Sequence, residues 1–291
     1  MSDLELQQAT AVSAAAHAPA RRRGRMPRIG TLVAGAFVVF LLAATVAPDL
    51  VATQDPNEIA PADAFQSPSL AHWFGTDESG RDVYSRVVAG TATSLLIGVT
   101  ATAIGLALGL ALGVLASFGG RIADFSVNRL VEVLFAFPGL LLALLVIVVY
   151  GPGPVTATVA VGLSTAPGYA RIIRGQLVAI RSSQYVEAAR VLGRSPARIL
   201  SRHVLPNALV PLFVLATLGI GQAIVWAAAL SYLGLGAQPP AAEWGAMLAA
   251  GRTYLATAWW MTVFPGLMIV GTTIATTVLG RALTRRGRGE R

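Results

Sequence analysis

Six long runs of apolar residues alternate with polar segments along the chain. Each run is close to or above the roughly 20 residues that a helix needs to cross a bilayer. The runs cover residues 29–47, 91–118, 126–150, 155–173, 207–235 and 259–283. This pattern predicts an all-α polytopic membrane protein with six transmembrane helices. It also predicts one membrane domain over residues 29–291, which follows a basic tail over residues 1–28.

The start of the chain also has some features of a secretory signal peptide. Arginines precede the first apolar run, and small residues end it at Thr45 and Ala47. The run of 19 residues is longer than the roughly 7–15 of a signal core, and Pro48 would directly follow the cleaved bond. We therefore expect an uncleaved first span.

The arginines are distributed very unevenly between the two sides of this six-span layout. Of the 22 basic residues, all of them arginine, 19 fall on one side: in the tail, at Arg121 and Arg129, in the loop from Arg171 to Arg202, and from Arg281 to the end of the chain. Cytoplasmic loops carry such an excess of basic residues. We therefore expect both termini and the loop over residues 174–206 to be cytoplasmic.

The composition excludes several other classes of protein. Hydrophobic residues make up 55% of the chain and charged residues only 12%, far below the roughly 25% of soluble proteins. The chain has no cysteine and three scattered histidines, so we expect no metal site. It also has no lysine for a phosphate-binding loop, so a partner must bind any nucleotide. The pI of 10.9 reflects the arginines gathered on one side of the six-span layout, so it does not indicate binding of nucleic acid.

The loop over residues 174–206 contains the pattern of two short helices joined by a glycine. Tyr185, Ala188, Ala189 and Leu192 recur at helical spacing and form an apolar stripe, while Glu187, Arg190 and Arg194 lie on another face. Gly193 stands where a helix C-cap is expected, and Ser195 with Pro196 predicts a new helix start. We expect Pro206 to end the second helix. Pieces this short need a packing partner.

Such a basic helix pair is also typical of a segment that lies on an anionic membrane surface. The residues themselves favour another interpretation. Glu187-Ala188-Ala189, three residues, Gly193, nine residues and His203-Val204-Leu205-Pro206 resemble the EAA loop of permease subunits in ATP-driven (ABC-type) importers. His203, in place of the usual isoleucine, resembles the peptide and nickel branch of that family.

Four further stretches resemble the same branch. They are His72 to Gly98, Glu132 with Phe135 to Pro138, Tyr169 to Arg171 with Arg174, and Ser231 to Arg252. Together the resemblance covers nearly all of the chain from His72 to Leu283. Thr277 to Arg285 departs from it, since the Asn and Asp common near that point in relatives are missing.

The resemblance implies a permease subunit in a bacterial cell membrane. Its implied partners are a second, similar permease, two ABC ATPase subunits that bind ATP, and an extracytoplasmic solute-binding protein. It implies no catalytic residue and no cofactor in this chain. It implies contact with the ATPase through Tyr185, Glu187, Ala188, Ala189, Leu192 and Gly193. Dipeptides, oligopeptides, nickel complexes and opine-like solutes all stay open as substrates.

A self-contained, ion-coupled secondary transporter is the alternative from another class. Such carriers usually need clusters of ionisable residues at the middle of the bilayer. Here Glu132 is the only acid clearly within an apolar run, and Arg129 three residues earlier predicts an ion pair near the interface. The chain alone therefore favours the importer subunit.

Two more local patterns lead to structural expectations. Gly105, Gly109 and Gly113 recur every four residues, which allows another helix to approach closely along one face. Asp77 and Arg81, at i and i+4, predict an exposed ion pair on an external amphipathic segment. Such an exposed pair contributes only about 0.3–0.5 kcal/mol.

Overall fold

The computed structural model describes residues 29–238 and 240–287, so the predicted basic tail and the last arginines lie outside the described residues. The regular structure of the described part is helical, with turns and loops between the helices and one isolated bridge between Thr76 and Asp82. The predicted all-α class is confirmed. The long helices are α2 (Ile29–Val46), α4 (Val83–Phe118), α5 (Gly120–Phe135), α6 (Gly139–Tyr150), α7 (Pro154–Arg181), α10 (Leu205–Tyr232) and α12 (Trp260–Gly287).

Shorter helices lie in the connections between the long ones. They are α3 (Pro48–Val51), η1 (Pro61–Asp63), α8 (Gln184–Val191), α9 (Pro196–Ile199), η2 (Leu200–Val204), α11 (Trp244–Gly251) and η3 (Arg252–Tyr254). We call residues 52–82, between α3 and α4, the cap segment. It consists mainly of turns and loops, and Asp82 begins α4 by accepting a hydrogen bond from the backbone N–H of Ser85 at 2.8 Å.

The expected run over residues 126–150 differs most from its prediction. It is divided into α5 and α6, which meet at an angle of 91°. The break falls at Ala136 to Pro138, because the residue before a proline is driven out of the helical region and the proline itself lacks an N–H. Pro167 and Pro211, by contrast, lie inside the continuous helices α7 and α10.

Among the described helices, four are long and apolar enough to cross a membrane, or five if α5 and α6 form one broken span. The four are α2, α4, residues 211–232 of α10 and residues 260–283 of α12. Helix α7 has 28 residues, but Arg171, Arg174 and Arg181 occupy its second half. The count of six spans therefore stays a prediction.

Helices α4 and α7 pack against each other along the predicted glycine face. A Cβ atom at Gly105 would lie 2.5 Å from Thr165 Oγ1, and one at Gly109 would lie 2.5 Å from Tyr169 Cβ. Both distances are far shorter than van der Waals contact. The expected close helix approach is thus confirmed, and α7 is the helix that occupies it.

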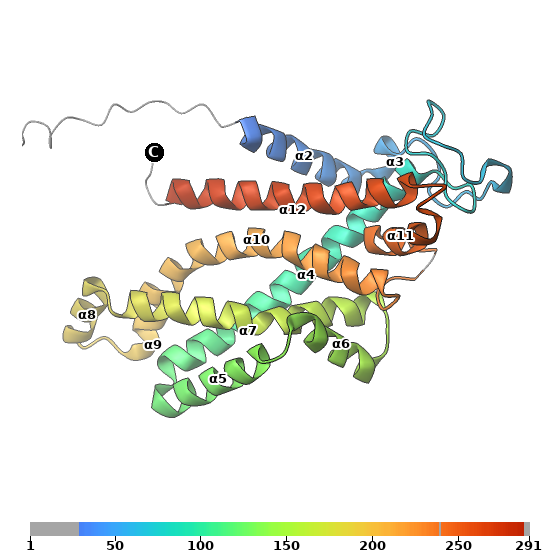
Figure 1. Ribbon diagram of the computed structural model, residues 1–291. Coiled ribbons are helices and arrows are strands. Elements are labelled where there is room, and N and C mark those ends of the chain that lie inside the picture. The colour runs from blue at the N-terminus through green and yellow to red at the C-terminus, as the bar shows by residue number, and fades with distance from the viewer. Residues whose placement is uncertain (1–28, 239, 288–291) are drawn as a thin grey trace, which may run out of the picture.

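Figure 1 shows that the long helices run between two ends of the molecule. The cap segment and α11 lie at one end, which we call the cap end. Helices α8 and α9 lie at the other, the α8 end, together with the start of α2 and the last turns of α12. Helix α4 has 36 residues, which at 1.5 Å per residue is about 54 Å. It crosses the molecule diagonally and enters the cap end with its first turns.

Candidate functional site

The candidate site is the segment between α7 and α10, where the chain makes the predicted helix, glycine break and second helix. Gly193 follows α8 with a φ of +73°. Its N–H donates to Arg190 O at 2.9 Å, and the N–H of Arg194 donates to Ala189 O at 3.1 Å. These two bonds make a Schellman motif, which requires a left-handed residue and therefore favours glycine. The predicted C-cap is confirmed.

The second helix begins as predicted but ends differently. The Ser195 side chain caps α9 by accepting from the N–H of Arg198, and Pro196 takes the first helical position. Pro206 does not end this helix. The chain passes from α9 through the π-helical turn η2 into α10, and Pro206 lies in the first turn of α10. Proline is tolerated in the first turn of an α-helix.

One face of α8 is buried against the rest of the chain. Val186 and Ala189 are buried, and they belong to a cluster shared with Ile173 and Leu177 of α7 and Val204 of η2. Ala189 was predicted to lie on the apolar stripe that contacts the ATPase, and Val186 was not named, although the two residues are spaced i, i+3. The structure places Ala189 on the buried face instead, and the contact with the ATPase stays a prediction. Ala189 thus anchors α8 to its own subunit.

The opposite face of α8 is apolar and exposed. Val191 is 84% exposed, Leu192 is 76% exposed and Tyr185 is 47% exposed. Ala188 lies between them, and Glu187 is exposed at their edge. Five of the six predicted contact residues, including Gly193, are therefore accessible. Val191, which the sequence analysis omitted, belongs to the same face.

Arginines fix the position of α8 relative to α7 and α4. The Arg181 guanidinium donates to the carbonyl oxygen of Ser117, at the end of α4, and lies 5.4 Å from the centre of the Phe118 ring. Arg190 of α8 donates to the carbonyl oxygen of Arg181 at 3.3 Å. These contacts occupy free carbonyls near the ends of α4 and α7. Arg190 thus links α8 to the end of α7, and Arg181 links α7 to the end of α4.

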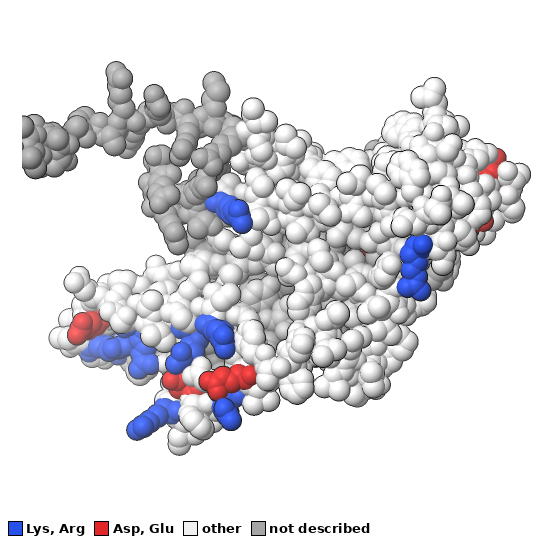
Figure 2. All heavy atoms as spheres, viewed as in Figure 1, with Lys and Arg blue, Asp and Glu red and all other residues white. Residues whose placement is uncertain are grey.

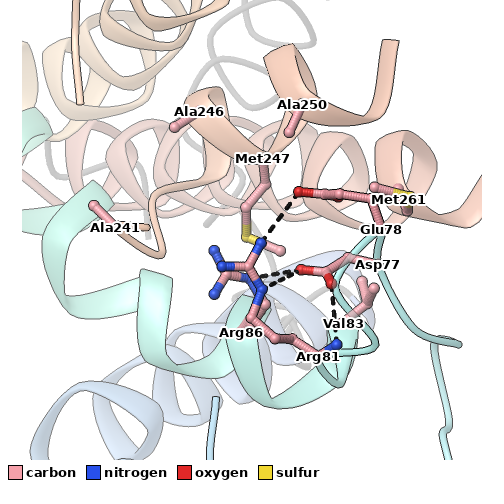
Figure 3. Close-up of a pocket in the computed structure, with 10 residues that line it drawn as sticks. All are labelled: Asp77, Glu78, Arg81, Val83, Arg86, Ala241, Ala246, Met247, Ala250 and Met261. Atoms are coloured by element: carbon pink, nitrogen blue, oxygen red, sulfur yellow. Dashed lines mark hydrogen bonds and ion pairs between the residues drawn. The ribbon is translucent and has the colours of Figure 1, made fainter. Parts of the chain in front are cut away.

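The cap end has a different kind of polar site (Figure 3). Arg81 Nε donates to Asp77 Oδ2 at 2.7 Å, Arg81 also reaches Glu78 at 3.2 Å, and Arg86 Nε lies 3.6 Å from the same Asp77 oxygen. Asp77, Arg81 and Arg86 are all buried. The prediction of an exposed Asp77–Arg81 pair was therefore wrong, because the start of α4 and α11 cover it.

Backbone groups complete the coordination of Arg86. Its guanidinium donates to the carbonyl oxygens of Pro56 at 3.1 Å and Pro240 at 3.2 Å. It thereby ties the cap segment, α4 and the loop before α11 together. This arrangement satisfies a buried charge both electrostatically and by hydrogen bonds, as a buried charge requires.

Tryptophans lock α11 and α12 onto the same end. Trp244 Nε1 donates to Val87 O at 3.0 Å, and Trp260 Nε1 donates to Thr76 O at 2.9 Å. Glu243 is buried and caps α11 by accepting from the N–H groups of Gly245 and Ala246. No sequence periodicity signals these long-range bonds. We find no group of three or more metal-ligand side chains within the described residues.

The long apolar helices and the exposed helix at one end define a helical membrane protein with one apolar face uncovered. In solved structures, the chain is similar to a subunit of the MetNI methionine ABC transporter in inward-facing form. The TM-score is 0.53 at 24% identity, over 68% of this chain and 96% of that one. It is also similar to a chain of an amino acid ABC transporter with histidines, with a TM-score of 0.55 at 18% identity over 69% and 94%. These similarities show the fold.

Comparison of sequences identifies the family. The pattern described as "Binding-protein-dependent transport system inner membrane component" matches residues 105–289. The chain is 36% identical over 262 residues to the dipeptide transport system permease protein of Alkalihalophilus pseudofirmus, covering 90% of this chain and 85% of that protein. It is 40% identical over 250 residues to the probable D,D-dipeptide transport system permease protein of Escherichia coli, covering 86% and 84%. The chain belongs to this family of inner-membrane transport components.

Family membership confirms several predictions together. The chain is a multi-pass membrane protein and a permease subunit of a binding-protein-dependent ABC importer, so its role is transport and it is not an enzyme. The resemblance that the EAA loop and the four other stretches suggested is the correct one.

Proposed function

We propose that this chain forms half of the translocation path of an importer for short peptides. A second permease would form the other half, two ATPase subunits would bind and hydrolyse ATP, and an external binding protein would deliver the peptide. The printed names of similar proteins support the substrate class, since they are permeases for dipeptides, D,D-dipeptides and glutathione.

The charges on the surface support a cytoplasmic location for the α8 end. Figure 2 shows the visible arginines gathered mainly over α5, α7 and α8, whereas few lie at the cap end. Basic residues accumulate on the cytoplasmic side of membrane proteins. The start of α2 and the last turns of α12 lie at this same end (Figure 1). We therefore expect both termini to be cytoplasmic and the cap segment to face the outside.

The exposed apolar face of α8 is the observation that carries the proposal for coupling. Val191 and Leu192 are largely exposed on a helix that projects from the α8 end. Apolar side chains grouped in this way on an aqueous surface mark a site for another protein. A helix whose apolar face enters a groove is a common recognition mode. We assign that groove to the ATPase subunit.

The buried face of α8 supplies the mechanical connection. Val186 and Ala189 belong to one buried cluster with residues of α7, η2 and α10, so we expect movement of α8 with the ATPase to displace those helices. ATP-driven closure of the two ATPase subunits would pull α8 of both permeases together. Rigid-body and hinge motion of packed helices is the usual way in which such a displacement opens and closes a passage.

Ala188→Arg tests the assignment because Ala188 is exposed in the middle of the proposed contact face. A long charged side chain there would be buried without a partner at the interface, which costs several kcal/mol. We expect the variant to insert and fold normally but to lose the ATPase subunit on purification. Ala197→Arg makes the same change at an exposed position of α9 and is the matched control.

Ala189→Arg is unsuitable for this test, since it would disrupt packing inside the subunit. An Ala188→Arg complex that retains the ATPase, and hydrolyses ATP normally when the loaded binding protein is added, would disprove the assignment of α8. Peptide uptake by the complete importer, with ATP, tests the substrate class separately.

A further inference from the structure

Two stretches that the sequence analysis singled out meet at one cavity in the half of the molecule near the α8 end. Glu132, close to the break between α5 and α6, comes from one stretch. Arg171 and Arg174 of α7 come from the other, almost 40 residues away. The cavity has a volume of about 170 Å³, well above the roughly 10–15 Å³ that one water needs. It is lined by Ala116, Val127, Asn128, Val131, Glu132, Ala170, Arg171 and Arg174.

Most charges around this cavity are already neutralised. Arg174 forms a bidentate pair with Asp124 at 2.8 and 3.0 Å, and Asn128 donates to the same carboxylate at 2.7 Å. Glu132 pairs with Arg129 at 3.3 Å, with both side chains more than half exposed. The pair at Arg174 is fixed by its geometry, whereas the exposed pair at Glu132 is weak and exchangeable.

Arg171 differs from these groups. Within the described part of the chain, no carboxylate lies within ion-pair distance of its guanidinium. Its Cζ atom lies 4.4 Å from the centre of the Phe135 ring. A cation over an aromatic face is held in place while its N–H groups stay free. Arg171 is thus a preorganised and exposed guanidinium at the rim of a polar cavity.

The position of these charges indicates that the cavity borders water. Ionisable side chains are costly against lipid and, in membrane proteins, face a protein interior or an aqueous passage. The side of α5 turned away from α7 exposes Ile122, Phe125 and Val133 together with Arg129. The other charged edge of α5 lies beside α7, where Asp124 pairs with Arg174 at the cavity.

We propose that this cavity receives the carboxylate end of the transported solute and that Arg171 is the residue that binds the carboxylate. A guanidinium forms two parallel hydrogen bonds with a carboxylate, which an ammonium group cannot reproduce. Glu132 on the same cavity suits the ammonium of a zwitterionic peptide. The inference rests on the proposed function, because it takes the solute to be a short peptide.

The test measures solute binding in the absence of the external binding protein. The selectivity of that protein therefore does not affect the measured affinities. The complex of both permeases and both ATPase subunits, in lipid nanodiscs and without nucleotide, is titrated with dialanine and with dialanine amide. We expect the wild type to bind the acid at least about tenfold more tightly than the amide, as for loss of one charge-assisted contact. Arg171→Gln should weaken binding of the acid by a similar factor and leave the amide unchanged.

Arg129→Gln is the matched control, because Arg129 is exposed on the adjacent helix but does not line the cavity. It should keep the preference for the acid. Equal binding of acid and amide by the wild type, or an unchanged preference in Arg171→Gln, overturns the proposal. The proposal is also overturned if Arg171→Gln binds dialanine as the wild type does and loses only bound phosphatidylglycerol, because Arg171 would then be a lipid-binding residue. Uptake of dialanine by wild-type proteoliposomes with ATP and binding protein tests the proposed function independently.

Discussion

The two ends of this molecule use charge and apolar surface in opposite ways. At the cap end, Asp77, Arg81 and Arg86 are buried together, and two tryptophans bond to distant carbonyls. At the α8 end, arginines lie on the surface, and the apolar residues Val191 and Leu192 face solvent. The cap end buries its charges in a network of its own, although Leu70 and Trp73 of the cap segment are exposed, whereas the α8 end keeps its arginines on the surface.

This difference matches two mechanical requirements of an importer subunit. Buried charges and long-range hydrogen bonds make a rigid block, since removal of one partner leaves the others unsatisfied. Short helices held by one buried face and one glycine turn can move as a unit with whatever binds them. Helices α4 and α7 join the two regions along the glycine face described above.

The largest expected effect is at the cap end. Asp77→Ala leaves the guanidinium groups of Arg81 and Arg86 buried without their shared carboxylate. We expect a loss of about 3–5 kcal/mol in the free energy of unfolding, as for other broken buried pairs. Thermal unfolding of the purified subunit in detergent measures the change as a lower Tm. Glu58→Ala, which removes an exposed acid from the same cap segment, should leave Tm unchanged. Equal Tm values for the two variants would show that the buried network does not stabilise the cap.

An intermediate effect on stability is expected where α4 packs against α7, the contact that joins the two regions. In Gly109→Ala, the new methyl group would lie 2.5 Å from Tyr169 Cβ and 2.9 Å from the backbone nitrogen of Ala170. Backbone cannot move aside as a flexible side chain does, so overpacking should cost about 1–3 kcal/mol.

The same unfolding measurement applies to this variant. Gly35→Ala is the control, because no other group lies within 4 Å of the added Cβ. There we expect unchanged or slightly higher stability, since alanine favours a helix interior. A tolerated Gly109→Ala would mean that α4 and α7 are free to separate.

The smallest effect on stability, with a large effect on coupling, is expected at the α8 end. Gly193→Val introduces a β-branched residue at a φ of +73°, although no neighbour obstructs the new side chain. Strain of this kind costs about 1–3 kcal/mol where the structure retains it. Here the exposed end of α8 can unwind locally and relieve it, so we expect Tm to stay close to wild type.

Co-purification of the ATPase subunit with the Gly193→Val variant measures this local effect. Gly193→Asn is the matched control, because asparagine accepts the left-handed conformation more readily, and we expect it to retain the ATPase. Loss of the ATPase from both variants would mean that any side chain at position 193 blocks the contact. Retention of the ATPase by both variants would mean that the left-handed turn is not needed for ATPase binding.

The amino-acid sequence by itself determined the features that depend on neighbouring residues. Apolar runs specify helices, since backbone groups in lipid must bond within their own segment. The spacing of Gly105, Gly109 and Gly113 specified a packing face, and Gly193 with Ser195 specified the turn after α8. The residues around Glu187 identified the family, because their order and spacing are themselves the signal.

Tertiary structure alone decided the features that depend on distant partners. Asp77 and Arg81 look like a solvent-exposed pair until the start of α4 and α11 cover them. Ala188 and Ala189 look equivalent until α7 and α10 bury one and leave the other free. Likewise, Phe135 and Arg171 lie on different helices and are far apart in the sequence. Only the packing of α5 against α7 brings them together at one cavity. Burial is a property of the assembled helices, and a local pattern shows which residues share a face but not which face is covered.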